Sequence, residues 1–123
     1  ANDDDLIEML LNANSEAALV KSINNTYPIH LACQNGHLSL KTVELLIKHG
    51  QKHSTIHAKS KHYEFLPLHF ACSNDQTPVE VIRTLLLHSK ETVHEKTKFD
   101  STPLYMAIAS NHSHEVIDIL LRF

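Results

Sequence analysis

A short proline-containing block recurs three times along the chain, and this repetition limits the possible folds more than any other feature of the sequence. Its copies are residues 27–33, 66–72 and 102–108, and their prolines lie 39 and then 36 residues apart. A unit of this length cannot bury an apolar face by itself, whereas a stack of such units can. We therefore expect a chain of similar units held together by contacts between neighbours.

Each block predicts a short helix. Proline suits the first position of a helix, and apolar residues one, three, four and five positions after it predict one buried face. A second, amphipathic helix is predicted from apolar pairs three to four residues apart, and its four copies are residues 6–11, 42–47, 81–86 and 116–121. In the third of these copies, Thr77 is expected to cap the helix, with Pro78 in the first turn and Glu80 closing a capping box.

A polar stretch of about 20 residues precedes each following proline, and it is typical of a loop with an extended finger. Each such stretch contains Lys-Ser or Lys-Thr, at residues 21–22, 59–60 and 96–97. Only one helix precedes the first proline. We therefore expect one domain over residues 1–123, with a half unit at 1–15 and three units at 16–53, 54–92 and 93–123. The last unit is expected to be truncated or uncapped, as part of a longer chain.

These blocks together resemble the ankyrin repeat, whose signature is Pro-Leu-His-x-Ala followed by an apolar Val-x-x-Leu-Leu helix. The resemblance implies an all-α solenoid of helix–loop–helix repeats with finger loops, half a repeat plus three. The chain departs from the family pattern where Tyr27 and Leu66 replace the threonine before proline, and where Tyr105 replaces the histidine. The usual turn glycine of the finger is also missing, so we expect irregular loops rather than tight hairpins.

Composition excludes several functional classes. The formal charge of −3 disfavours a general nucleic-acid binder. The longest apolar run, residues 104–109, is far shorter than the roughly 20 residues that span a bilayer. With two glycines, Gly36 and Gly50, the chain cannot form a P-loop, a dinucleotide-binding turn or a nucleophile elbow. We expect no enzyme activity and no cofactor.

The segment 48–62 is rich in histidine and lysine, and it suggests an alternative function. A ligand- or metal-responsive sensor could bind zinc or an anion there. His49, His53 and His57 would line one face of a continuous helix, and two histidines four residues apart can share a zinc ion. However, Gly50 indicates a helix end within the segment, and no acid lies between residues 45 and 63. We therefore expect no physiological metal site, and a solvated surface as the simpler interpretation.

The resemblance instead implies protein–protein recognition by a non-catalytic scaffold inside the cell, and we expect it in the cytoplasm. In the ankyrin family, partner contacts concentrate five, four and two residues before the proline and six and seven after it. Carried over to this chain, they are Ile23, Asn24, Thr26, Gln34 and Asn35, then His62, Tyr63, Phe65, Ser73 and Asn74, then Lys98, Phe99, Ser101, Ala109 and Ser110. The rings of Tyr63, Phe65 and Phe99 either anchor a partner or only pack the fingers together.

The two cysteines, Cys33 and Cys72, occupy the same position in neighbouring first helices. Packed helices lie about 8–10 Å apart, whereas a disulfide needs Cα atoms within about 7 Å. We therefore expect both thiols to be buried, reduced and unpaired.

Overall fold

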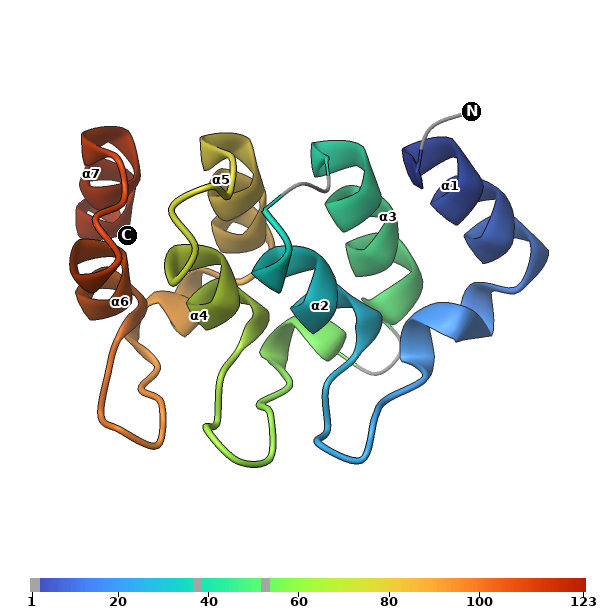
Figure 1. The fold of residues 1–123 in the computed structure, drawn as a ribbon, viewed down its shortest axis with the longest axis horizontal. Coiled ribbons are helices and arrows are strands. Elements are labelled where there is room, and N and C mark those ends of the chain that lie inside the picture. The colour runs from blue at the N-terminus through green and yellow to red at the C-terminus, as the bar shows by residue number, and fades with distance from the viewer. Residues whose placement is uncertain (1–2, 37–38, 52–53) are drawn as a thin grey trace.

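The chain folds into two rows of helices and three projecting loops. The computed structural model describes residues 3–36, 39–51 and 54–123, and these contain helices but no strand. The longer helices are α1 (Asp3–Ala13), α3 (Leu40–Gly50), α5 (Val79–His88) and α7 (His114–Arg122). The shorter ones are α2 (Pro28–Gln34), α4 (Pro67–Cys72) and α6 (Pro103–Ala109). Figure 1 shows each kind of helix in a row of its own, with the three loops projecting on one side.

The polar stretches before the prolines are more ordered than the sequence predicts. Each contains a short 3₁₀ helix, namely η1 (Ser15–Leu19), η3 (Thr55–His57) and η4 (Lys90–His94). Buried small residues hold these turns against the long helices. Thr55 packs so closely on Gly50 that a Cβ at Gly50 would lie 2.2 Å from the Thr55 Oγ1. This approach explains a glycine at the end of α3 and confirms the predicted helix end.

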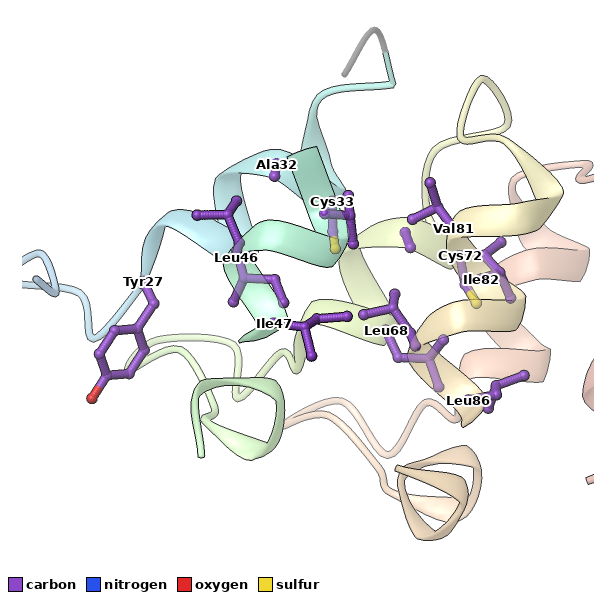
Figure 2. Close-up of a cluster of buried hydrophobic side chains, with 14 of the residues drawn as sticks. Tyr27, Ala32, Cys33, Leu46, Ile47, Leu68, Cys72, Val81, Ile82 and Leu86 are labelled. Atoms are coloured by element: carbon purple, nitrogen blue, oxygen red, sulfur yellow. The ribbon is translucent and has the colours of Figure 1, made fainter. Parts of the chain in front are cut away.

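The core lies between the two rows, and the same repeat positions form it in each unit. Leu46, Leu85 and Leu120 expose 6%, 0% and 4% of their surface, so their predicted equivalence is confirmed. Alanine four residues after each proline is also buried in all three short helices. Side chains this small let the short helices pack closely, and Figure 2 shows the resulting layer around the central units.

Two predictions about the helices are wrong. The predicted buried face is not complete in every short helix, because Leu31, three residues after its proline, is 57% exposed and Ile108, five residues after its proline, is 60% exposed. Phe70 and Met106 are half-buried and pack against the core. Thr77 does not cap α5, which begins at Val79 with Pro78 as the residue before it. The Thr77 hydroxyl is instead buried, with no hydrogen-bond partner among the described residues.

Both cysteines are buried and free, as predicted from their positions. They lie on the neighbouring helices α2 and α4 (Figure 2). Burial raises the pKa of the Cys33 thiol to about 12 and raises the pKa of the Cys72 thiol as well. Since the thiolate is the reactive form, the native thiols are expected to be inert.

We expect alkylation of the native chain to be slow at both cysteines. After unfolding without a reductant, two alkyl groups should add, because no disulfide has to be broken first. Intact mass spectrometry measures this, and a reduced sample is the control. An unfolded, unreduced chain that takes up no alkyl group would contradict the repeat register.

Candidate functional site

The three loops end in fingers with similar tips, formed by residues 22–26, 60–65 and 97–101. In the first, the Ser22 N–H donates to the Thr26 carbonyl, and in the third the Thr97 N–H donates to the Ser101 carbonyl, both at 2.9 Å. In the second tip the Ser60 N–H donates to the Phe65 carbonyl, and this turn is one residue longer than the other two. The serine and threonine hydroxyls accept further bonds from backbone N–H groups of the same tips. These bonds explain the repeated Lys-Ser and Lys-Thr pairs.

The expectation of irregular loops is therefore wrong for the finger tips. Each tip turns on a residue with a positive φ, which glycine usually supplies. Here Asn25, Glu64 and Asp100 take that place, with φ of 59°, 55° and 65°. Asn and Asp tolerate this left-handed conformation better than most residues do. Tight turns thus form without glycine.

Backbone bonds connect the fingers to one another. The Lys61 N–H donates to the Asn24 carbonyl at 2.7 Å, and the Lys98 N–H donates to the Tyr63 carbonyl at 2.9 Å. The fingers therefore stand side by side at a fixed spacing (Figure 1). Side chains at matching positions of successive tips are brought into one row.

The two repeat histidines fix each finger to the unit before it. In α2 the Nδ1 of His30 accepts from the Tyr27 N–H at 2.9 Å, so its Nε2 carries the proton and donates to the Ala58 carbonyl at 2.7 Å. In α4, His69 makes the same two bonds, to the Leu66 N–H and to the Glu95 carbonyl. Burial lowers the pKa of both rings. The bond from each histidine to the next finger was not predicted.

Between the fingers and the short helices lie two grooves at equivalent places. The first finger groove, of about 240 Å³, is lined by Asn24, Thr26, Leu31, Gln34, Ser60, His62, Tyr63 and Phe70. The second finger groove, of about 310 Å³, is lined by Ser73, Ser101, Tyr105, Met106, Ala109 and Ser110. Nine of the residues expected to contact a partner line these grooves, namely Asn24, Thr26, Gln34, His62, Tyr63, Ser73, Ser101, Ala109 and Ser110.

The other expected contact residues do not line these grooves, and one of them has a structural role. Ile23, Asn35, Lys98 and Phe99 are exposed, and Ile23 and Phe99 expose 90% and 64% of their surface. The amide of Asn74 donates to the Gln34 carbonyl at 2.8 Å and accepts from the Gln76 N–H. Asn74 therefore connects the first and second units.

The finger rings are both exposed and in contact. The Tyr63 ring centroid lies 5.8 Å from that of Phe99 and 5.7 Å from that of Phe65. Phe65 is half-buried and lies 5.1 Å from Phe70 of α4. Tyr63 is 54% exposed. Phe65 thus packs the finger on its helix, while Tyr63 and Phe99 keep most of their faces in solvent.

Sequence reasoning missed Leu31, Phe70, Tyr105 and Met106 as groove residues. The helical period could have found those at the third position after proline. At 3.6 residues per turn, the first, fourth and fifth residues after the proline lie within an arc of about 100° around the helix axis. The third residue lies about 100° away from the edge of that arc. A large apolar residue recurs at this position, at the edge of the core, where Leu31 is exposed and Phe70 and Met106 are half-buried.

Acidic residues of the next polar stretch, η4 and the residue after it, lie beside the histidine- and lysine-rich segment. The His57 Nε2 lies 2.5 Å from a Glu91 carboxylate oxygen, and this hydrogen bond lowers the pKa of Glu91. The Lys59 ammonium lies 3.5 Å from Glu95 and donates to the Lys96 carbonyl. The segment is therefore less cationic than its own sequence indicates.

The three candidate zinc ligands do not share one helix. His49 lies in α3, which ends at Gly50, and His57 lies in η3. His53 falls outside the described residues. Within residues 3–36, 39–51 and 54–123, no three histidine, cysteine or acidic side chains lie together as a metal site would require. The single-face arrangement on which the zinc hypothesis rested is therefore wrong.

Stacked helix–loop–helix units with bonded fingers define a helical-repeat solenoid. A family model described as Ankyrin repeats (3 copies) matches residues 1–95, and the chain belongs to this family. Ankyrin repeats are generally non-catalytic modules that bind other proteins. No curated protein matched the chain. None of the helices in the described part of the chain is long and apolar enough to cross a membrane.

Proposed function

We propose that the chain binds a partner protein with the face formed by the finger tips and the two finger grooves. The observation that carries this proposal is the pair of grooves at equivalent places, one beside each of α4 and α6. They form one surface because backbone bonds hold the fingers in a row. Exposed aromatic groups beside polar ones are typical of residues that dominate protein interfaces. Tyr63 and Phe99 are the proposed anchors.

The surface of the proposed partner carries apolar side chains and is either uncharged or acidic. Lys61 and Lys98 are exposed at the finger tips next to the two rings, where they attract an acidic partner during encounter. Lys96 is already paired with Asp100 at 3.4 Å. We place this partner and the chain in the cytoplasm, which agrees with two free thiols and with the common intracellular occurrence of ankyrin repeats.

The alternative function, a sensor of zinc or anions at residues 48–62, has less support. Glu91 and Glu95 lie against His57 and Lys59, and their charge opposes the binding of an anion. The zinc ligands proposed for it are divided between α3 and η3.

We expect Tyr63→Ala and Phe99→Ala each to weaken partner binding by roughly 1–3 kcal/mol, because each removes a large exposed ring from the proposed surface. The melting temperature should stay nearly unchanged. The measurement is an affinity pull-down with the wild-type chain, followed by titration of the captured partner with each variant.

Leu87→Ala is the matched control. Leu87 is 63% exposed, close to the 64% of Phe99, but it lies on α5 in the other row of helices. It should leave the affinity unchanged. If the aromatic variants melt many degrees lower and still bind, the rings belong to the core of the fingers, and the proposal is wrong.

A further inference from the structure

One asparagine of the sequence is followed by glycine, and it lies at the end of a helix. This asparagine is Asn35, and the glycine is Gly36. The Asn35 N–H donates to the Leu31 carbonyl at 2.9 Å and closes the last turn of α2, while the Asn35 side chain is exposed. Within the described ranges, the Gly36 N–H donates no hydrogen bond. The peptide nitrogen that follows Asn35 therefore lies outside the hydrogen bonds of the helix.

This nitrogen and the Asn35 side chain can react with each other, and water is the only other reactant. Hydroxide takes the proton of the Gly36 N–H, and the nitrogen then attacks the Asn35 Cγ. The new bond joins that nitrogen to Cγ, and the bond from Cγ to Nδ2 breaks. Nδ2 takes a proton from water and leaves as ammonia. Water then opens the resulting succinimide ring at either carbonyl carbon, which gives aspartate or isoaspartate without oxidation or reduction. Glycine favours the attack because no side chain restricts its backbone.

The packing of the first unit on the second requires this glycine. A Cβ at Gly36 would lie 2.8 Å from the Gln76 Cβ and 3.0 Å from the Asn74 Nδ2. A residue with a side chain would therefore push against the loop that precedes α5. The contact between the two units thus keeps a reactive glycine next to Asn35.

The same contact restrains the reaction. At a ψ of 103°, the Gly36 nitrogen and the Asn35 Cβ lie on opposite sides of the Asn35 Cα–C bond, whereas the succinimide ring needs them on one side. The peptide between residues 35 and 36 has to turn before the ring can close. Asn74 opposes this turn on both sides of Asn35, because its amide donates to the Gln34 carbonyl at 2.8 Å and lies against Gly36.

We propose that Asn35 is a site of spontaneous deamidation, and that the Asn74 amide sets its rate in the folded chain. The product carries a negative charge next to Gln34, which lines the first finger groove. Asn35 is itself one of the expected partner contacts, so the new carboxylate repels an acidic partner surface. This effect on binding rests on the proposed function. It makes the site a slow, one-way switch that weakens recognition as the protein ages.

Peptide mapping of the full chain after storage at mildly alkaline pH tests the site. Trypsin releases residues 22–41 as one peptide, which also contains Asn24 and Asn25 as internal controls. We expect the change in mass from amide to acid at Asn35 alone, with isoaspartate detected by an isoaspartyl methyltransferase. Asn35→Gln should remove the change. Equal conversion of Asn24 or Asn25, or an Asn35 that stays unchanged even in chain unfolded with urea, overturns the proposal.

Two substitutions of Asn74 test its effect on the rate. Asn74→Asp removes the donor to the Gln34 carbonyl and keeps an acceptor for the Gln76 N–H, whereas Asn74→Ala removes both. In the folded chain, each should speed the conversion of Asn35 by about two- to tenfold, which is the range for one lost hydrogen bond. In urea, both variants should react at the rate of the wild type, because the contact is absent there.

Ser73→Ala is the matched control for these variants. The Ser73 hydroxyl donates to the Phe70 carbonyl of its own unit, so its loss should leave the rate at Asn35 unchanged. Circular dichroism at the storage temperature identifies any variant that has unfolded. A folded Asn74→Asp or Asn74→Ala chain that reacts no faster than the wild type overturns the role of Asn74, as does a wild type that reacts equally fast with and without urea.

Asn35→Asp tests the effect on recognition, with the partner captured by the wild-type chain. It should weaken binding by about two- to fivefold, the range for an exposed pair of charges, whereas Asn35→Gln should bind as the wild type does. Unchanged binding by Asn35→Asp overturns the effect on recognition. The peptide map needs no partner, so a failure of the proposed function and a failure of the deamidation site are distinguishable.

Discussion

We expect Leu85→Ala to lower the free energy of unfolding by about 2–5 kcal/mol, which is the range for a leucine truncated in a packed core. Leu85 is fully buried on α5, the central long helix, and α5 packs against both α3 and α7. The cavity therefore weakens the contacts of one unit with its neighbours on both sides. Because repeat arrays are stabilised through neighbour interfaces, the loss should spread along the chain.

Urea unfolding of the wild type and the variant measures this loss. The control is Leu87→Ala, which removes the same atoms two residues further along the same helix. Leu87 is 63% exposed, and its truncation should cost less than about 0.5 kcal/mol. Equal and small losses in the two variants would show that the buried face of α5 has been assigned wrongly.

The second large effect is expected from acid. His30 and His69 are neutral in the fold, and burial lowers the pKa of both below the usual value of 6.5. Above pH 6.5 both rings are neutral in the folded and unfolded chain, and their full contribution to stability is present. As the pH falls through 6.5, the unfolded chain binds protons first. We expect the free energy of unfolding to fall between pH 7 and pH 5.5, by at most about 2.5 kcal/mol for the two rings together, which is the limit set by their usual pKa in the unfolded chain.

Proton binding also breaks specific bonds in the fold. A protonated Nδ1 cannot accept from the Tyr27 or Leu66 N–H, so each turn loses a buried hydrogen bond. For His69, the nearby Lys59 lowers the pKa and the nearby Glu95 raises it. Urea unfolding at a series of pH values tests this. In His69→Gln, about half of the pH-dependent loss should disappear, and an unchanged pH dependence would contradict the assignment.

The helices were predictable because their signals are local. Proline at the start of α2, α4 and α6 and the apolar pairs of the long helices depend on residues within one turn of each other. The buried cysteines followed from the same register. The start of α5 was missed because the sequence fits a helix capped by Thr77 as well as one preceded by Pro78. In the structure the Thr77 hydroxyl is buried and Pro78 is the residue before the helix.

The candidate site was less predictable because it depends on the stacking of units. Glu91 lies 34 residues after His57 in the chain, and no local pattern pairs them. The tips without glycine also depend on neighbours, since the bonds from Lys61 to Asn24 and from Lys98 to Tyr63 hold them in place. Offsets from the proline nevertheless selected several groove residues, because every unit repeats the same geometry.

The histidine bonds give the array a polarity. Each histidine holds the base of the finger that follows it, so the second and third fingers are attached to the preceding unit. The tip of the first finger is held by its own short-range bonds and by the single bond from Lys61 to Asn24. Ile23 on that tip is the most exposed of the large apolar side chains in the described ranges, at 90%. In the proposed recognition surface, the second and third fingers are therefore held at their bases, and we expect any adjustment to a partner to occur at the first finger.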